Sequence, residues 1–119
     1  GQRDDVVPLI LTSPVFEVTA GDIVIIRGRV RRGAAVASGS RRPLLLYDTE
    51  LGPEHGLKPE LTSDWQEFEL IRPIHRGREF QLCASLLTQA EVHLDDLQFY
   101  CIEAGIEDNP VRMIGTSGR

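Results

Sequence analysis

The sequence has little of several features that mark large functional classes of protein. It has two cysteines, one lysine among 13 basic residues, and no apolar run near the roughly 20 residues that a membrane-spanning helix needs. It opens without a signal-peptide pattern, and it contains no heptad or internal repeat. No segment sustains the helical spacing of apolar residues. These absences exclude a coiled coil and argue against insertion into a membrane.

Motifs of catalysis are missing as well. His55, His75 and His93 are isolated, without the H-x-x-x-H spacing of metal ligands. No serine lies in a G-x-S-x-G elbow, and neither cysteine lies in a C-x-x-C pair. Glu67 and Glu69 would lie about 7 Å apart on one strand face, as an acid–base pair does in glycoside hydrolysis. Because no cleft is evident there and arginines are available as partners, we expect the protein to be no enzyme.

Length and composition indicate one globular domain. The chain has 119 residues, of which 41% are hydrophobic and 26% are charged. Its net charge of −5 makes it a poor general binder of nucleic acid, since phosphate contacts need a positive field. Gly1 stands where an initiator methionine would stand, so we take the chain to be a fragment whose partners include the neighbouring domains of a parent protein. Its compartment is unknown.

The two cysteines are Cys83 and Cys101. A tight turn at residues 88–90 would set Cys83 opposite a residue near Asp96 rather than opposite Cys101. We therefore expect two buried free thiols, with a disulfide between them as the alternative.

The pattern of apolar residues predicts an all-β fold. Short segments rich in β-branched, aromatic and leucine residues are separated by turns of Gly, Pro and Asp, which is typical of a two-sheet antiparallel β-sandwich. About eight strands suit a jelly-roll topology. We assign residues 1–103 to this domain and residues 104–119 to a tail or linker, with Val111 to Ile114 pinned to the body. The expected strands are residues 6–11, 15–18, 23–31, 43–48, 56–61, 65–72, 80–86 and 91–101.

The segment 91–101 is the strand around which the rest is organised. Val92 and Leu94 would point to one face, whereas Leu97 and Phe99 would point to the other. Either the strand is covered on both sides, or a bulge at Asp95–Asp96 switches its face. Both alternatives require a second layer of structure.

Arginines mark the outer face of the expected strand 23–31. Its even positions form a core face, so Arg27, Arg29 and Arg31 share the other face. Residues 32–42 have small side chains and no period, which predicts a long loop. Its Arg41 and neighbouring arginines either grip an anionic ligand or lie in a solvated flexible loop.

The order of the segments PVFEVTAGDIVIIRGRVR, LLLYD, SDWQEFELIR and VHLDDLQFY resembles the jelly-roll carbohydrate-binding modules of the galactose-binding-domain-like class. That class includes bacterial domains appended to larger proteins. In it an Ala-Gly turn leads into a strand, a tryptophan opens a later strand, and an Asp-Asp pair lies in the last one. The resemblance covers roughly residues 6–102. It implies a non-catalytic carbohydrate-binding accessory domain, and with it an extracytoplasmic or cell-surface location.

The expected ligand-binding residues lie on the outer sheet face. If the strands 23–31 and 65–72 are neighbours, as the resembled fold implies, their polar faces coincide. Guanidinium and carboxylate groups would then bind sugar hydroxyls while an indole stacks on the sugar ring. The alternative is a solvated ladder of ion pairs, each worth under about 1 kcal/mol, with the indole sealing the rim of the sandwich. The candidate ligand-binding residues are Trp65, Glu67, Glu69, Arg27 and Arg29, with Tyr47 at the margin.

The resemblance also implies a structural calcium site at Asp95 and Asp96, since calcium takes six to eight oxygen ligands. Asp4, Asp5 and Glu17 are the expected partners. In the alternative, one aspartate accepts backbone N–H groups at a bulge or turn, and the other faces water.

Two functions therefore compete. The first is carbohydrate binding on the arginine-bearing face. The second is a structural or protein–protein interaction module without a small ligand, which predicts a mostly buried Trp65 and an exposed apolar edge at residues 6–11.

Overall fold

The computed structural model describes residues 9–36, 42–87, 90–105 and 111–117. Within these residues the chain is all-β, which confirms the predicted class, and it has nine strands and one 3-10 helix, η1 (Pro53–His55). No helix in these segments has the length and hydrophobicity needed to cross a bilayer. The strands are β1 (Leu9–Thr12), β2 (Phe16–Val18), β3 (Ile23–Val36), β4 (Leu44–Asp48), β5 (Gln66–Pro73), β6 (Arg78–Phe80), β7 (Leu82–Leu86), β8 (Ala90–Ile102) and β9 (Val111–Ser117).

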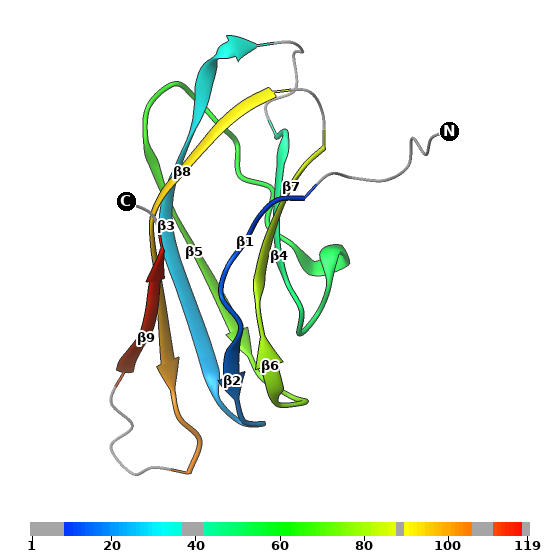
Figure 1. Ribbon diagram of the computed structural model, residues 1–119, viewed down its shortest axis with the longest axis vertical. Helices are drawn as coiled ribbons and strands as arrows, with labels where there is room; N and C mark the ends of the chain where they lie inside the picture. The colour runs from blue at the N-terminus through cyan, green and yellow to red at the C-terminus, as the bar shows by residue number, and fades with distance from the viewer. Residues whose placement is uncertain (1–8, 37–41, 88–89, 106–110, 118–119) are drawn as a thin grey trace.

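The strands form three sheets in which every neighbouring pair is antiparallel. The largest has the order β5-β3-β8-β9, the second has the order β1-β7-β4, and β2 pairs with β6. Figure 1 shows the four-stranded sheet along one side of the molecule and β1, β7 and β4 along the other. The strands β3, β4, β5, β7 and β8 alternate between these two sheets along the chain.

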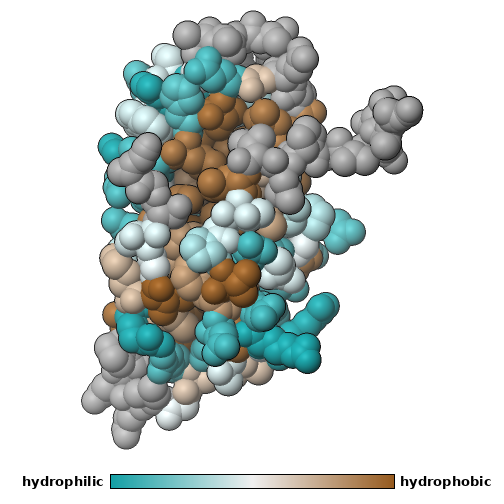
Figure 2. All heavy atoms as spheres, viewed as in Figure 1, coloured by the Kyte–Doolittle hydropathy of each residue, from teal (hydrophilic) through white to brown (hydrophobic). Residues whose placement is uncertain are grey.

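One hydrophobic core joins all three sheets. β3 contributes Val24, Ile26 and Val30 through its even positions, as predicted, and β5 contributes Phe68 and Leu70. In the view of Figure 2, hydrophobic residues gather in the upper half between β8 and β7, and hydrophilic residues line the outer margin beside β3 and β8. The remaining buried core residues are Val18, Leu44, Leu46, Leu61, Ile74, Phe80, Leu82, Ala84, Leu97 and Phe99.

β8 changes its core-facing side at a bulge, which decides between the two alternatives for this strand. Its pairing with β3 shifts register between Arg27, opposite Gln98, and Arg29, opposite Asp95. Asp96 occupies the shift and has a φ of 60°, in the left-handed region. Leu94 before the bulge and Leu97 after it therefore both pack on the core.

Two local predictions were wrong. Residues 32–36 extend β3 instead of forming a loop, and Val36 lies opposite Ala90. Backbone hydrogen bonds to β8 support this extension without any apolar period in its side chains. The strand expected at 56–61 is a single bridge, in which Leu57 exchanges two backbone hydrogen bonds with Leu46. Pro59 cannot donate a hydrogen bond, so the pairing does not continue.

The strand expected at 80–86 is divided. β6 ends at Phe80 and β7 begins at Leu82, while the N–H of Gln81 donates to the hydroxyl of Thr49.

In the stretch for which we expected a tail, Val111–Ser117 forms β9 at the edge of the four-stranded sheet. It pairs with Leu97–Ile102 of β8, so it covers only the second half of that strand.

Both cysteines are buried free thiols, as expected. The hairpin that we used to argue this is absent, because β7 and β8 belong to different sheets. Burial raises the pKa of each thiol, and the charge of Asp22 adds to the effect at Cys101. The Cys101 thiol donates to the Asp22 carboxylate at 3.7 Å.

Candidate functional site

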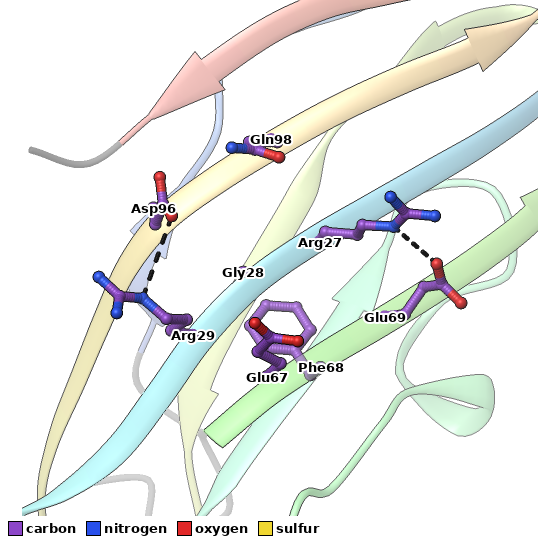
Figure 3. Close-up of a pocket in the computed structure, with 8 residues that line it drawn as sticks. All are labelled: Arg27, Gly28, Arg29, Glu67, Phe68, Glu69, Asp96 and Gln98. Atoms are coloured by element: carbon purple, nitrogen blue, oxygen red, sulfur yellow. Dashed lines mark hydrogen bonds and ion pairs between the residues drawn. The ribbon is translucent and has the colours of Figure 1, made fainter. Parts of the chain in front are cut away.

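The outer face of β5, β3 and β8 carries a polar groove. The β3–β5 register sets Arg27 opposite Glu69 and Arg29 opposite Glu67, so the two strands are neighbours as the hypothesis requires. The groove has a volume of about 580 Å³. Its lining residues, drawn in Figure 3, are Arg27, Gly28, Arg29, Glu67, Phe68, Glu69, Asp96 and Gln98.

Arg27 and Arg29 turn to opposite sides of the groove. Figure 3 shows Arg27 directed toward Glu69 on β5 and Arg29 directed toward Asp96 on β8. The Nε atom of Arg27 donates to Glu69 at 2.7 Å, in a pair with about half of each side chain exposed. This hydrogen bond, and then the negative charge of Glu69, raises the pKa of Arg27 above its usual value. The guanidinium group of Arg27 therefore stays charged.

Arg29 is held more loosely. Its ion pairs with Asp95 and Asp96 measure 3.6 and 4.0 Å, which is longer than a hydrogen bond. Its Nε atom is buried and has no hydrogen-bond partner among the described residues. Glu67 lies across β3–β5 from Arg29 and makes no hydrogen bond or ion pair in the described part of the chain. Two residues that line the groove thus have hydrogen-bonding capacity that no described residue uses.

Gln98 completes the third side of the groove from β8. The hydroxyl of Tyr100 donates to the side-chain oxygen of Gln98 at 2.6 Å. The Gln98 amide nitrogen therefore keeps its own donor capacity for the groove. The Tyr100 ring also lies 5.6 Å from the guanidinium of Arg27, which joins these two strands by a cation–π contact.

Trp65 lies on the same outer face, one residue before β5. The guanidinium groups of Arg29 and Arg31 are 5.3 and 4.7 Å from its ring. The residue is 36% exposed. The indole therefore packs against the arginines of the sheet surface, and each contact is worth about 0.5–1 kcal/mol at such an exposed site.

A second polar network continues the outer face beyond the groove. The Nε atom of Arg31 donates to Nδ1 of His93 at 3.2 Å. The other ring nitrogen of His93 lies 2.8 Å from a carboxylate oxygen of Glu91. Since arginine only donates, Nδ1 of His93 is the acceptor, and Nε2 carries the proton toward Glu91.

Tyr47 does not join this site. It lies on β4, in the sheet β1-β7-β4, and stands opposite Cys83 of β7 in the strand register. Burial, followed by the influence of Cys83, raises the pKa of Tyr47. Its membership of a different sheet separates it from the residues of the groove.

Asp95 and Asp96 have partners other than a metal in the structure. Both pair with Arg29, and Asp95 also accepts the backbone N–H of Asp96 at 2.8 Å, which supports the bulge. Across the described residues, no group of three His, Cys, Asp or Glu side chains is placed to hold a metal ion. Asp4 and Asp5, two of the expected calcium partners, lie outside those residues.

The expected arginine-rich loop is only partly described. Arg41 lies outside the described residues, and Arg31 and Arg32 belong to β3. Arg42 bonds the backbone carbonyl of Lys58 and pairs with Glu60 at 3.7 Å. These contacts tie Arg42 to its own chain.

Gln98 was missing from the sequence prediction of the site. Its outward direction follows from the alternation after the bulge, because Leu97 and Phe99 on either side of it face the core. Continuing that alternation past Asp96 would have identified Gln98.

Comparisons with protein-family models, with curated proteins and with solved structures gave no match. The candidate site therefore rests on its geometry and chemistry.

Proposed function

We propose that this chain is a non-catalytic carbohydrate-binding accessory domain that holds a glycan in the polar groove of β5, β3 and β8. The observation that carries this proposal is the unused hydrogen-bonding capacity around Arg29. Arg29 and Glu67 both line the groove, and among the described residues the Nε atom of Arg29 has no hydrogen-bond partner and the Glu67 carboxylate makes no hydrogen bond or ion pair.

Sugar hydroxyls match such a groove because each hydroxyl both donates and accepts. A pair of neighbouring hydroxyls can accept from Arg29 and donate to Glu67, and the Gln98 amide can donate to a third. Charged groups roughly double the strength of these hydrogen bonds. Trp65 at the end of the same face offers the apolar surface on which a sugar ring stacks.

The fold proposed with this function is a jelly-roll β-sandwich of the galactose-binding-like class. The alternation of strands between the four-stranded and three-stranded sheets supports it, as does the single core between them. If the proposal holds, the protein works outside the cytoplasm or at the cell surface, where glycans are displayed.

A second function, protein–protein interaction, is favoured by exposed apolar side chains on the same outer face. Ile71, Val111 and Met113 are each about half exposed there. The apolar edge expected at residues 6–11 lies partly outside the described residues. Trp65 is 36% exposed, so most of its surface is covered, and its exposure does not separate the two functions.

Glycan binding is expected to depend on Glu67 and Arg29. In affinity electrophoresis or on a glycan array of neutral and acidic polysaccharides, Glu67→Gln and Arg29→Met should each weaken retention of the bound glycan. Loss of a hydrogen bond to a charged group is worth about 1.5–3 kcal/mol, so the affinity should fall about ten- to a hundredfold.

Glu79→Gln is the matched control, because Glu79 is an exposed carboxylate on β6, outside the groove. It should bind like the unmodified protein. Failure of the folded, unmodified protein to bind any glycan would contradict the proposed function. Equal losses of affinity in Glu79→Gln and Glu67→Gln would show that the groove is not the binding site.

A further inference from the structure

The outer face of the four-stranded sheet has an apolar half beside the groove. The strand registers place two apolar rows across all four strands, on the side opposite to the core. The first row contains Ile71, Ile25, Tyr100 and Met113. The second contains Pro73, Ile23, Ile102 and Val111. We call these eight residues the apolar rows.

The apolar rows are exposed at the two outer strands of the sheet, β5 and β9. Ile71 is 52% exposed, Met113 is 49% exposed and Val111 is 54% exposed. On the two central strands, Ile23, Ile25, Tyr100 and Ile102 are half-buried. A contiguous apolar surface that spans four strands is uncommon on a monomer and marks an interaction site.

We propose that the apolar rows join two copies of this chain in a two-fold dimer. The charges that border the rows favour a second copy over a partner of complementary charge. The next row toward the groove holds Arg27 and Glu69, which are already paired with each other at 2.7 Å. Among the described residues, this rim on the groove side leaves no unpaired charge for a charged partner. An apolar surface is complementary to itself, and a two-fold axis brings it against its own copy.

Charge also sets the orientation of the dimer. Arg27, Arg29 and Arg31 follow one another along β3, with carboxylates on β5 and β8 at their sides. A two-fold axis parallel to β3 would stack one arginine strip on the other, which like-charge repulsion opposes. An axis that runs across the strands through the apolar rows overlaps only these rows. The two grooves then lie at opposite ends of the dimer and stay open.

The contact is small, so the dimer should be weak. Eight residues a side is well below the about 20–30 residues a side of a standard interface. The dimer should therefore form only at high protein concentration. Each copy carries a net charge of −5, so added salt should strengthen the dimer by screening the repulsion between copies.

Analytical ultracentrifugation of the full chain from about 10 μM to about 1 mM tests this proposal. The weight-average mass should rise above 13.3 kDa toward twice that value as concentration and salt increase. Val111 and Ile71 lie on different strands, so each can be changed separately. Val111→Lys and Ile71→Lys should each raise the dissociation constant at least about tenfold, because each variant buries an unpaired charge in the contact.

Val15→Lys is the control, since Val15 is 53% exposed but lies between β1 and β2, away from the outer face. It should leave the dimer unchanged. A weight-average mass equal to that of one chain at every protein and salt concentration would overturn the proposal. The apolar rows would then bind a partner other than a second copy. An equal effect of Val15→Lys and Val111→Lys would also overturn it. Neither result depends on glycan binding.

Discussion

Replacing Asp48 with alanine is expected to destabilise the fold by about 3–5 kcal/mol, because it leaves a buried arginine without its counter-charge. Asp48 is fully buried, and its carboxylate accepts from Nε of Arg72 at 2.6 Å. Its other oxygen accepts the backbone N–H groups of Glu50 and Leu51, which form the turn after β4. Urea unfolding followed by circular dichroism measures the change.

The control is Glu69→Ala, which removes a carboxylate from an ion pair of nearly the same length. The Arg27–Glu69 pair measures 2.7 Å, but about half of each side chain is exposed. Water replaces the lost partner there, so the cost should stay below about 1 kcal/mol. Similar losses in the two variants would contradict the argument that burial decides the strength of these pairs.

Gly28→Ala is expected to destabilise the protein by overpacking the core beneath the groove. A Cβ atom at Gly28 would lie 2.7 Å from Leu97 and 2.9 Å from the ring of Phe68, both of which are buried. Overpacking costs about 1–3 kcal/mol, which outweighs the about 0.4–1 kcal/mol that a Gly→Ala change gains from the unfolded state. Thermal or urea unfolding measures the balance.

Gly33→Ala is the matched change in the same strand. Its added methyl group would meet the end of the Glu91 side chain, which can move aside more easily than a core ring. The loss should therefore be smaller than at Gly28. A Gly28→Ala protein as stable as the unmodified one would mean that the core beneath the groove is less tightly packed than described.

The sequence predicted most of the faces of the strands, because alternation is a local property. The outward direction of Arg27 and Arg29 and the inward direction of Phe68 and Leu70 follow from a period of two. The bulge at Asp96 was one of two alternatives, since apolar residues on both parities of one strand require a change of face or cover on both sides.

Sheet membership is a different matter, because it depends on contacts between distant segments. Tyr47 was placed at the margin of the site, but β4 joins the opposite sheet, and nothing within LLLYD indicates which sheet it enters. Residues 32–36 form a strand because β8 offers backbone partners, and their small side chains do not reveal this. The loose ion pairs of Arg29 depend on distances that no sequence pattern contains.

The most direct test of the account is an NMR titration of the folded protein with a glycan that it retains, in which the Arg29 Nε–H is followed. The Arg29 Nε–H, the Trp65 indole N–H and the Gln98 side-chain amide should shift together, while Tyr47 on the opposite sheet should not. Shifts confined to residues outside the outer face of β5, β3 and β8 would contradict the groove as the binding site, and so would an Arg29 Nε–H signal that stays fixed at saturation.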